Sequence, residues 1–364
     1  MASGKWTNIA LLLLSVSMSS AAAQPVRTKH FQTLFPAWDG YLRNMMDSED
    51  CRDHREQYFN VSNTNDQALF YNLTNCVLSE MDELRKTEMG INGIVLGLLP
   101  TTLQLFGPST GEIAVLGTRR PLLAFMLCVA MPSLSTNGRM DNPIGEMKKH
   151  LEGVRSLKLI SGRGVWVMMS ILEYVLAAAA AYNVFSQVSQ VAYRSTSVSA
   201  IAINGKPASL FLWLSLVYAV HILGMWSLFL RFWEDETVPV GVGLARGEWV
   251  PCARSRALGL KHRKEVSPLS VVVKYTADIL SAVGFVYGTV ALSSQIFISL
   301  RDVVPIVARL MTGALVCRAV LSFEIHGLWE AANPPTEESG SAESEHEMIS
   351  GAGSEAARVV ESSN

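Results

Sequence analysis

The stretch VVVKYTADILSAVGFVYGTVALSSQIFI, residues 271–298, decides the fold of this chain. It contains only two charged side chains, Lys274 and Asp278. A helix needs about 20 apolar residues to cross the hydrocarbon core of a bilayer, so this stretch is long enough to span a membrane. The same reasoning applies to four other apolar runs, at residues 89–106, 165–185, 210–230 and 303–323.

The composition of the whole chain agrees with a membrane protein. Hydrophobic residues make up 49% and charged residues only 17% of the 364 positions, whereas soluble domains carry about 25% charged residues. Thirty basic residues against 32 acidic ones leave no excess positive charge for nucleic-acid binding. Five cysteines are too few for a disulfide-dense scaffold. We therefore expect an all-α fold, a polytopic transmembrane helical bundle over residues 89–330.

A sixth apolar run, residues 121–131, is too short to cross on its own. At 1.5 Å per residue it covers about 16 Å of a hydrocarbon core that is about 30 Å thick. If this run does not cross, fifteen basic residues fall in the two cytosolic loops and three in the later lumenal loops. The positive-inside rule favours that arrangement. We predict five full spans plus one short re-entrant or interfacial helix.

The N-terminus has the pattern of a secretory signal peptide. Lys5 precedes an apolar run, and small residues lead to Ala21-Ala22-Ala23. This order predicts cleavage after Ala23, with an uncleaved anchor as the alternative. Either way the following segment, residues 24–88, enters the secretory lumen.

Residues 24–88 are typical of a small glycosylated lumenal cap. Two sequons offer Asn60 and Asn72 for glycosylation. Cys51 and Cys76 are expected to pair in an oxidising compartment, with two free thiols as the alternative. The pattern after Asn65 suits one helix leading into the membrane. His30 and His54 are isolated, so we expect surface histidines and no metal site.

The chain ends in a polar segment, residues 331–364. From residue 333 on it holds seven glutamates and one basic residue, with many Ser, Gly and Pro. Such a composition cannot bury a core, so we expect a disordered acidic cytosolic tail.

The pentapeptide GPSTG at residues 107–111 matches the G-x-S-x-G pattern of hydrolases. In those enzymes a strand precedes the serine, whereas here a hydrophobic helix precedes it. A helix end followed by an N-cap Ser or Thr, with Glu112 in the next turn, explains the residues better. We therefore assign no catalytic residue.

Charged and ionisable residues inside the apolar runs are the best functional candidates. Each costs about 2.5–3.5 kcal/mol at a helix centre on insertion scales, so partners are expected. One hypothesis is a polar path in which His221 relays protons with Glu173. The alternative is structural pairing, of Glu173 with an arginine and of Lys274 with Asp278. The full set of intramembrane candidates is Glu173, His221, Lys274, Asp278, Arg309 and Arg318, with Glu324 following the last apolar run.

Residues 93–97 form a G-x-x-x-G motif, with Gly93 and Gly97 on one face of the first span. Small residues allow two membrane helices to approach closely. The motif predicts either packing against another span of the same chain or self-association.

The stretches LRKTEMGINGIVLGLLP (84–100), LFGPSTGEIA (105–114) and RRPLLA (119–124) resemble a group of filamentous-fungal multi-pass membrane proteins. The resemblance covers about 50 residues; the later spans are similar only in hydrophobic layout, and the segment before residue 84 departs from the group. It implies a membrane protein class and no particular reaction. Its motif residues are Gly107, Pro108, Glu112, Arg119, Arg120 and Pro121.

The motif suggests a structured turn after the first span. Glu112 and Arg119 are seven residues apart, which places them on one helix face, and Arg120 is adjacent. We therefore expect Glu112 to pair with Arg119 or Arg120. The alternative is that both arginines contact lipid phosphates.

These features favour a non-enzymatic protein with an interaction, organising or sensing role in the secretory pathway or plasma membrane. The competing hypothesis is a small-solute or proton-coupled transporter that uses Glu173, His221 and Asp278. No cofactor is expected. The expected partners are the bilayer, anionic headgroups at the cytosolic basic loops, and other proteins contacted through the helices; nucleic acid is not expected.

The charge asymmetry predicts that the loops at residues 139–163 and 231–264 are cytosolic. Sequons or single cysteines placed in each loop should stay unmodified by lumenal glycosylation and by impermeant thiol reagents added outside. Lumenal modification of the 231–264 loop would contradict five crossings.

Overall fold

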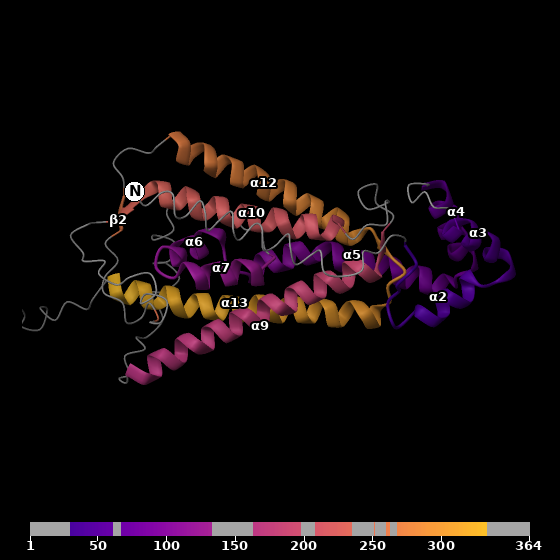
Figure 1. Cartoon of the computed structure of the whole chain (residues 1–364), viewed down its shortest axis with the longest axis horizontal. Coiled ribbons are helices and arrows are strands. Elements are labelled where there is room, and N and C mark those ends of the chain that lie inside the picture. The colour runs from indigo at the N-terminus through magenta and orange to yellow at the C-terminus, as the bar shows by residue number, and fades with distance from the viewer. Residues whose placement is uncertain are drawn as a thin grey trace, which may run out of the picture.

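The computed structural model describes residues 30–60, 67–132, 163–197, 208–234, 251, 260–262 and 268–332. Within these ranges the chain is mostly helical, and five helices are long and apolar enough to cross a membrane. They lie along the long axis of the molecule (Figure 1). They are α5 (Glu83–Phe106), α9 (Arg163–Arg194), α10 (Ala208–Arg231), α12 (Pro268–Ser293) and α13 (Leu300–Ala332). The expectation of five candidate spans is confirmed.

The run predicted at residues 271–298 is helical only to Ser293. Gln295–Ile296 forms strand β4, which pairs antiparallel with β1, Thr196–Ser197, after α9. Phe297 then adopts a left-handed backbone conformation, with a φ of 60°, which α-helix excludes. At the end of the bundle opposite the cap, β2 (Phe232–Glu234) pairs with β3 (Leu260–His262) (Figure 1).

Three short helices lie together at one end of the bundle (Figure 1), and we call this group the cap. They are α2 (Asp39–Met46), α3 (Glu49–Asn60) and α4 (Gln67–Glu80). A disulfide between Cys51 and Cys76 joins α3 to α4, as the sequence predicted. The single helix expected from the cap into the membrane is instead two helices, because Asp82 has an extended ψ of 140° and starts α5 as its N-cap.

The cap and the bundle share one hydrophobic cluster. Phe297, from the α12–α13 connection, is 1% exposed and packs in the cluster of Phe31, Phe70 and other cap residues. Its ring centroid lies 5.6 Å from that of Phe31. His30 is buried beside Phe70, with ring centroids 4.7 Å apart, so the expectation of a surface histidine is wrong for this residue. The left-handed turn at Phe297 thus inserts a bundle residue into the core of the cap.

Polar contacts reinforce this junction between cap and bundle. Glu88 on α5 accepts a hydrogen bond from the backbone N–H of Leu300 at 2.7 Å, which satisfies a donor at the start of α13. The Asn92 side chain donates to the Ile298 carbonyl at 2.8 Å. The Arg85 guanidinium lies 3.9 Å from the centroid of the Tyr41 ring. The N-terminal part of α5 therefore contacts both the cap and the α12–α13 connection.

Two further helices follow α5 and lie within the bundle: α6 (Thr110–Gly117) and α7 (Pro121–Ala130). Helix α6 packs against α10, and α7 packs against α9. Their apolar side chains belong to the same core as those of the long helices. Tyr218, near the middle of α10, donates to the carbonyl of Val129 at 3.2 Å, so α7 ends about halfway along the bundle.

The G-x-x-x-G motif packs helices of the same chain together. A Cβ atom added to Gly97 would lie 2.9 Å from the Cβ of Ser293 on α12, and one at Gly93 would lie 3.0 Å from the Ser293 carbonyl oxygen. The motif therefore lets α5 approach the C-terminal end of α12 closely. This is packing against another span of the same chain, one of the two uses that the motif predicted.

Gly97→Ala should lower the thermal midpoint of the full-length protein, because the added methyl group pushes α5 away from α12, at a cost of about 1–3 kcal/mol. Gly90 is the matched control, since a Cβ there meets nothing within 4 Å. Gly90→Ala should leave the midpoint unchanged or raise it slightly. Equal midpoints for the two variants would rule out the close contact.

Candidate functional site

A buried arginine at the start of α7 is the centre of a polar site within the bundle interior. Arg120 is 0% exposed. Its Nη1 donates to Glu173 Oε2 on α9 and to Glu324 Oε1 on α13, both at 2.5 Å. Its Nη2 donates to Ser170 Oγ at 2.6 Å. One guanidinium therefore connects three helices.

The local sequence explains how each side chain reaches this point. Arg120 is the N-cap residue of α7, and Pro121 takes the first helical position, where its missing N–H is not needed. Ser170 and Glu173 are three residues apart on α9 and so share one face of that helix. The Arg120 guanidinium also lies 5.3 Å from the ring of Tyr174, a distance at which a cation is attracted to an aromatic face.

The main energetic property of this cluster is the cost of breaking it. Glu173 is 4% and Glu324 0% exposed, so neither carboxylate is stabilised by bulk water. Removing Arg120 would leave buried acidic groups without their cation and would cost about 3–5 kcal/mol. The Arg120–Glu173–Glu324 cluster therefore makes the position of α7 depend on both α9 and α13.

A second ion pair fixes the turn before α6. Glu112 Oε2 accepts from Arg318 Nη1 on α13 at 2.7 Å. The same oxygen accepts from the backbone N–H of Ser109 at 2.8 Å, while Ser109 Oγ accepts from the Glu112 N–H, which completes a capping box. The structure thus differs from the expected pairing with Arg120, because that residue binds Glu173 and Glu324. The reason is that α13 brings Arg318 close to α6.

The residues of the GPSTG pentapeptide lie at a helix–helix turn. Gly107 is the C-cap of α5, and its extended backbone is followed by Pro108, which cannot continue a helix. Ser109 caps α6 with its side chain and donates from Oγ to Glu112 at 2.9 Å. A helix rather than a strand precedes this serine. Arg119 lies between α6 and α7.

The other intramembrane candidates are spread over the bundle. His221 is fully buried on α10. Lys274 and Asp278 lie one turn apart on α12, both half-buried, and no ion pair joins them. Arg309 is on an exposed face of α13, where its backbone carbonyl accepts from the Asn183 side chain at 2.8 Å. Helices α12 and α9 lie on opposite sides of the bundle (Figure 1), so Asp278 is not part of the cluster that contains Glu173.

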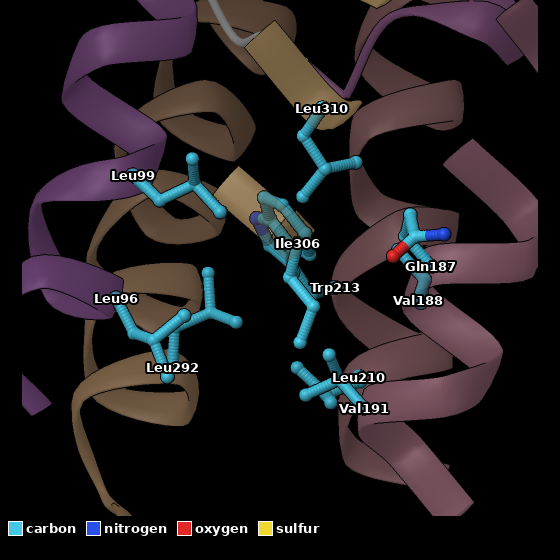
Figure 2. A pocket seen from close by; sticks show the side chains of 10 residues that line it. All are labelled: Leu96, Leu99, Gln187, Val188, Val191, Leu210, Trp213, Leu292, Ile306 and Leu310. Carbon is cyan, nitrogen blue, oxygen red and sulfur yellow. The ribbon is translucent and has the colours of Figure 1, made fainter. Parts of the chain in front are cut away.

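A small cavity lies between the five long helices. Its volume is about 10 Å³, enough for about one water molecule. Figure 2 shows that most of the side chains around it are aliphatic, with Gln187 and Trp213 as the residues that carry polar atoms. The Nε1 of Trp213 is buried and has no hydrogen-bond partner among the described residues. None of the intramembrane charged candidates lines this cavity.

The candidate glycosylation sites lie on the cap surface. Asn60 is the last residue of α3 and Asn72 is on α4, and both side chains are exposed. The predicted signal peptide at residues 1–23, residues 133–162 and the predicted tail from residue 333 lie outside the described residues. The basic cluster at residues 148–150 lies outside them as well.

Ser170 and the role of Glu324 were missed by sequence reasoning. The spacing of Ser170 and Glu173 on one helix face was a usable signal for the first. For Glu324 the available signal was its place at the end of an apolar run, since a carboxylate there needs a cation. Comparisons with protein-family models, with curated proteins and with solved structures found no match to this chain.

Arg318→Met should destabilise the protein by about 1.5–3 kcal/mol, the range for a hydrogen bond to a charged group, because Glu112 loses its cation. Adding Glu112→Gln should recover much of that loss, since Gln keeps the capping box without the charge. Arg309→Met, a change on the exposed face of the same helix, is the control and should have little effect. Strictly additive losses in the double variant would show that the two residues are uncoupled.

Proposed function

We propose that this protein is a non-enzymatic integral membrane protein that holds a lumenal cap rigidly on a helical bundle for interaction with partners. The observation that carries the proposal is the shared core at Phe297, which joins the cap to the α12–α13 connection. A cap that shares a core with the spans transmits a binding event to the bundle, whereas a cap on a flexible linker would not.

The proposed placement is in the secretory pathway or plasma membrane. The cap would face the lumen, with glycans at Asn60 and Asn72 and the tail in the cytosol. Support comes from the sequons and from the cap disulfide, since disulfides persist in oxidising compartments. The basic loops would then contact anionic lipid headgroups on the cytosolic side.

Helices α6 and α7 are proposed to be a re-entrant element. Helix α7 has 10 residues, about 15 Å, and ends near the middle of α10. The chain must return from there to Arg163, the first residue of α9. If α9 starts on the cytosolic side, its first residue lies on the side from which α6 and α7 entered. This arrangement keeps five crossings and the favourable division of basic residues.

The pairing of interior charges argues for this role over transport. Arg120 and Arg318 each bind glutamates of other helices, and the cavity between the spans is small and lined mostly by aliphatic side chains. The competing transporter hypothesis requires Glu173, His221 and Asp278 to act together, yet α12, the helix of Asp278, lies on the far side of the bundle from α9 (Figure 1).

Site-specific photocrosslinking distinguishes the two functions. A photoreactive residue at Tyr71, which is exposed on the cap, should give a discrete protein adduct in native membranes. Placed at Val286, an exposed apolar position on α12, the same residue should react with lipid. The Tyr71 adduct should also disappear when purified cap-specific antibody is added as a competitor.

Proteoliposomes with the purified full chain provide the opposing test. The proposed role predicts that a proton gradient decays at the same rate with the wild-type protein and with empty vesicles. Faster decay that is abolished by both Glu173→Gln and Asp278→Asn, combined with no protein adduct at the cap, would replace the proposal with transport.

A further inference from the structure

The two carboxyl groups bound by Arg120 lie unusually close together. Glu173 Oε2 and Glu324 Oε1 each accept from the same Nη1 atom at 2.5 Å. Two oxygens bound to one nitrogen at that distance are at most 5.0 Å apart. They come from different helices, α9 and α13, and both residues are less than 5% exposed. Packing therefore holds two acidic groups against each other in an apolar interior.

Full ionisation of both groups is costly in such a place. Two carboxylates that share a site in a low-dielectric medium repel strongly, and one of them takes up a proton. The second oxygen of Glu173, Oε1, is buried and has no hydrogen-bond partner among the described residues. An ionised carboxylate needs donors at both oxygens when water is excluded, so this oxygen points to a group that is not fully ionised.

We infer that Glu173 and Glu324 bind one proton between them, which makes the Arg120–Glu173–Glu324 cluster a proton-binding site in the bundle interior. The site then contains one carboxyl group, one carboxylate and one guanidinium, and its formal charge is zero. Release of the proton to water leaves two carboxylates and a net charge of −1. Because the groups titrate as a pair, the proton belongs to both carboxyls rather than to one.

Other titratable groups from the packed helices lie in the same half of the bundle. His221 on α10 and Glu173 on α9 are each ten residues, about 15 Å, from the helix end on that side. Glu112 on α6 is already bound to Arg318. The groups that a titration must separate from the pair are Tyr174 on α9, Cys128 on α7, His221 and Tyr218 on α10, Glu112 on α6, and Arg318, Cys317 and His326 on α13.

Loss of the proton has a structural consequence. Repulsion between the two carboxylates pushes α9 and α13 apart at the point where both hold the start of α7. The α6–α7 hairpin is attached to the bundle through this point and through the Glu112–Arg318 pair. The inference goes beyond the proposed function and does not depend on it, since the site needs no partner and no transport.

Infrared spectroscopy of the full chain in lipid nanodiscs tests the site directly. The wild-type protein should show the carbonyl band of a protonated carboxylic acid at neutral pH. Both Glu173→Gln and Glu324→Gln should lose that band, because the remaining carboxylate then pairs one-to-one with Arg120 and stays ionised. His221→Gln is the matched control from α10 and should keep the band.

The pH dependence of thermal unfolding gives a second readout. An ion cluster that binds no proton would not produce this dependence. The wild-type midpoint should fall as the pH is raised past release of the proton, while each single Gln variant should lack that fall. The double variant Glu173→Gln with Glu324→Gln should give little folded protein, since it leaves the Arg120 guanidinium without an anion in this cluster. Absence of the acid band in the wild-type protein, or its survival in both single variants, would overturn the inference.

Discussion

Arg120 is a cation in an apolar interior, and the arrangement of the bundle follows from what it must bind. Its two glutamate partners, Glu173 on α9 and Glu324 on α13, are separated from it by 53 and 204 positions in the sequence. A bundle in which both α9 and α13 were misplaced would leave the Arg120 charge without these anions, at a cost of several kcal/mol. Apolar packing between membrane helices has no such directional preference, because lipid tails are as apolar as the side chains they replace.

The same reasoning extends to the turn that follows α5. Glu112 caps α6 and binds Arg318, so one carboxylate joins a local helix start to a distant helix. Together the two ion-pair sites hold a pair of helices too short to cross the bilayer inside a bundle of longer ones. In the sequence these interior charges resemble transport residues. In the structure they account for the placement of α6 and α7.

The sequence predicts the helices of this protein better than it predicts which residues of different helices contact each other. Apolar length identified the five long helices, and the Cys51–Cys76 pairing followed from compartment and cysteine count. The partner of Glu112 was not predictable from helical spacing, since Arg318 is 206 positions away and only the packing of α13 against α6 brings it near. The end of α12 was placed too late, because the apolar residues 296–298 do not continue the helix: Ile296 belongs to strand β4 and Phe297 packs with the cap. The hydrophobicity of a residue does not show whether it lies in the bilayer or in the apolar core of the cap.

Phe297 has a consequence for the order of biosynthesis. The cap residues Phe31 and Phe70 are translated first, yet the ring that packs among them follows Phe70 by more than 200 residues. At synthesis rates of about 5–20 residues per second, that delay is about 10–45 s. During this interval the nascent cap exposes the apolar surface that Phe297 later covers, and its core is complete only after α12 has been synthesised.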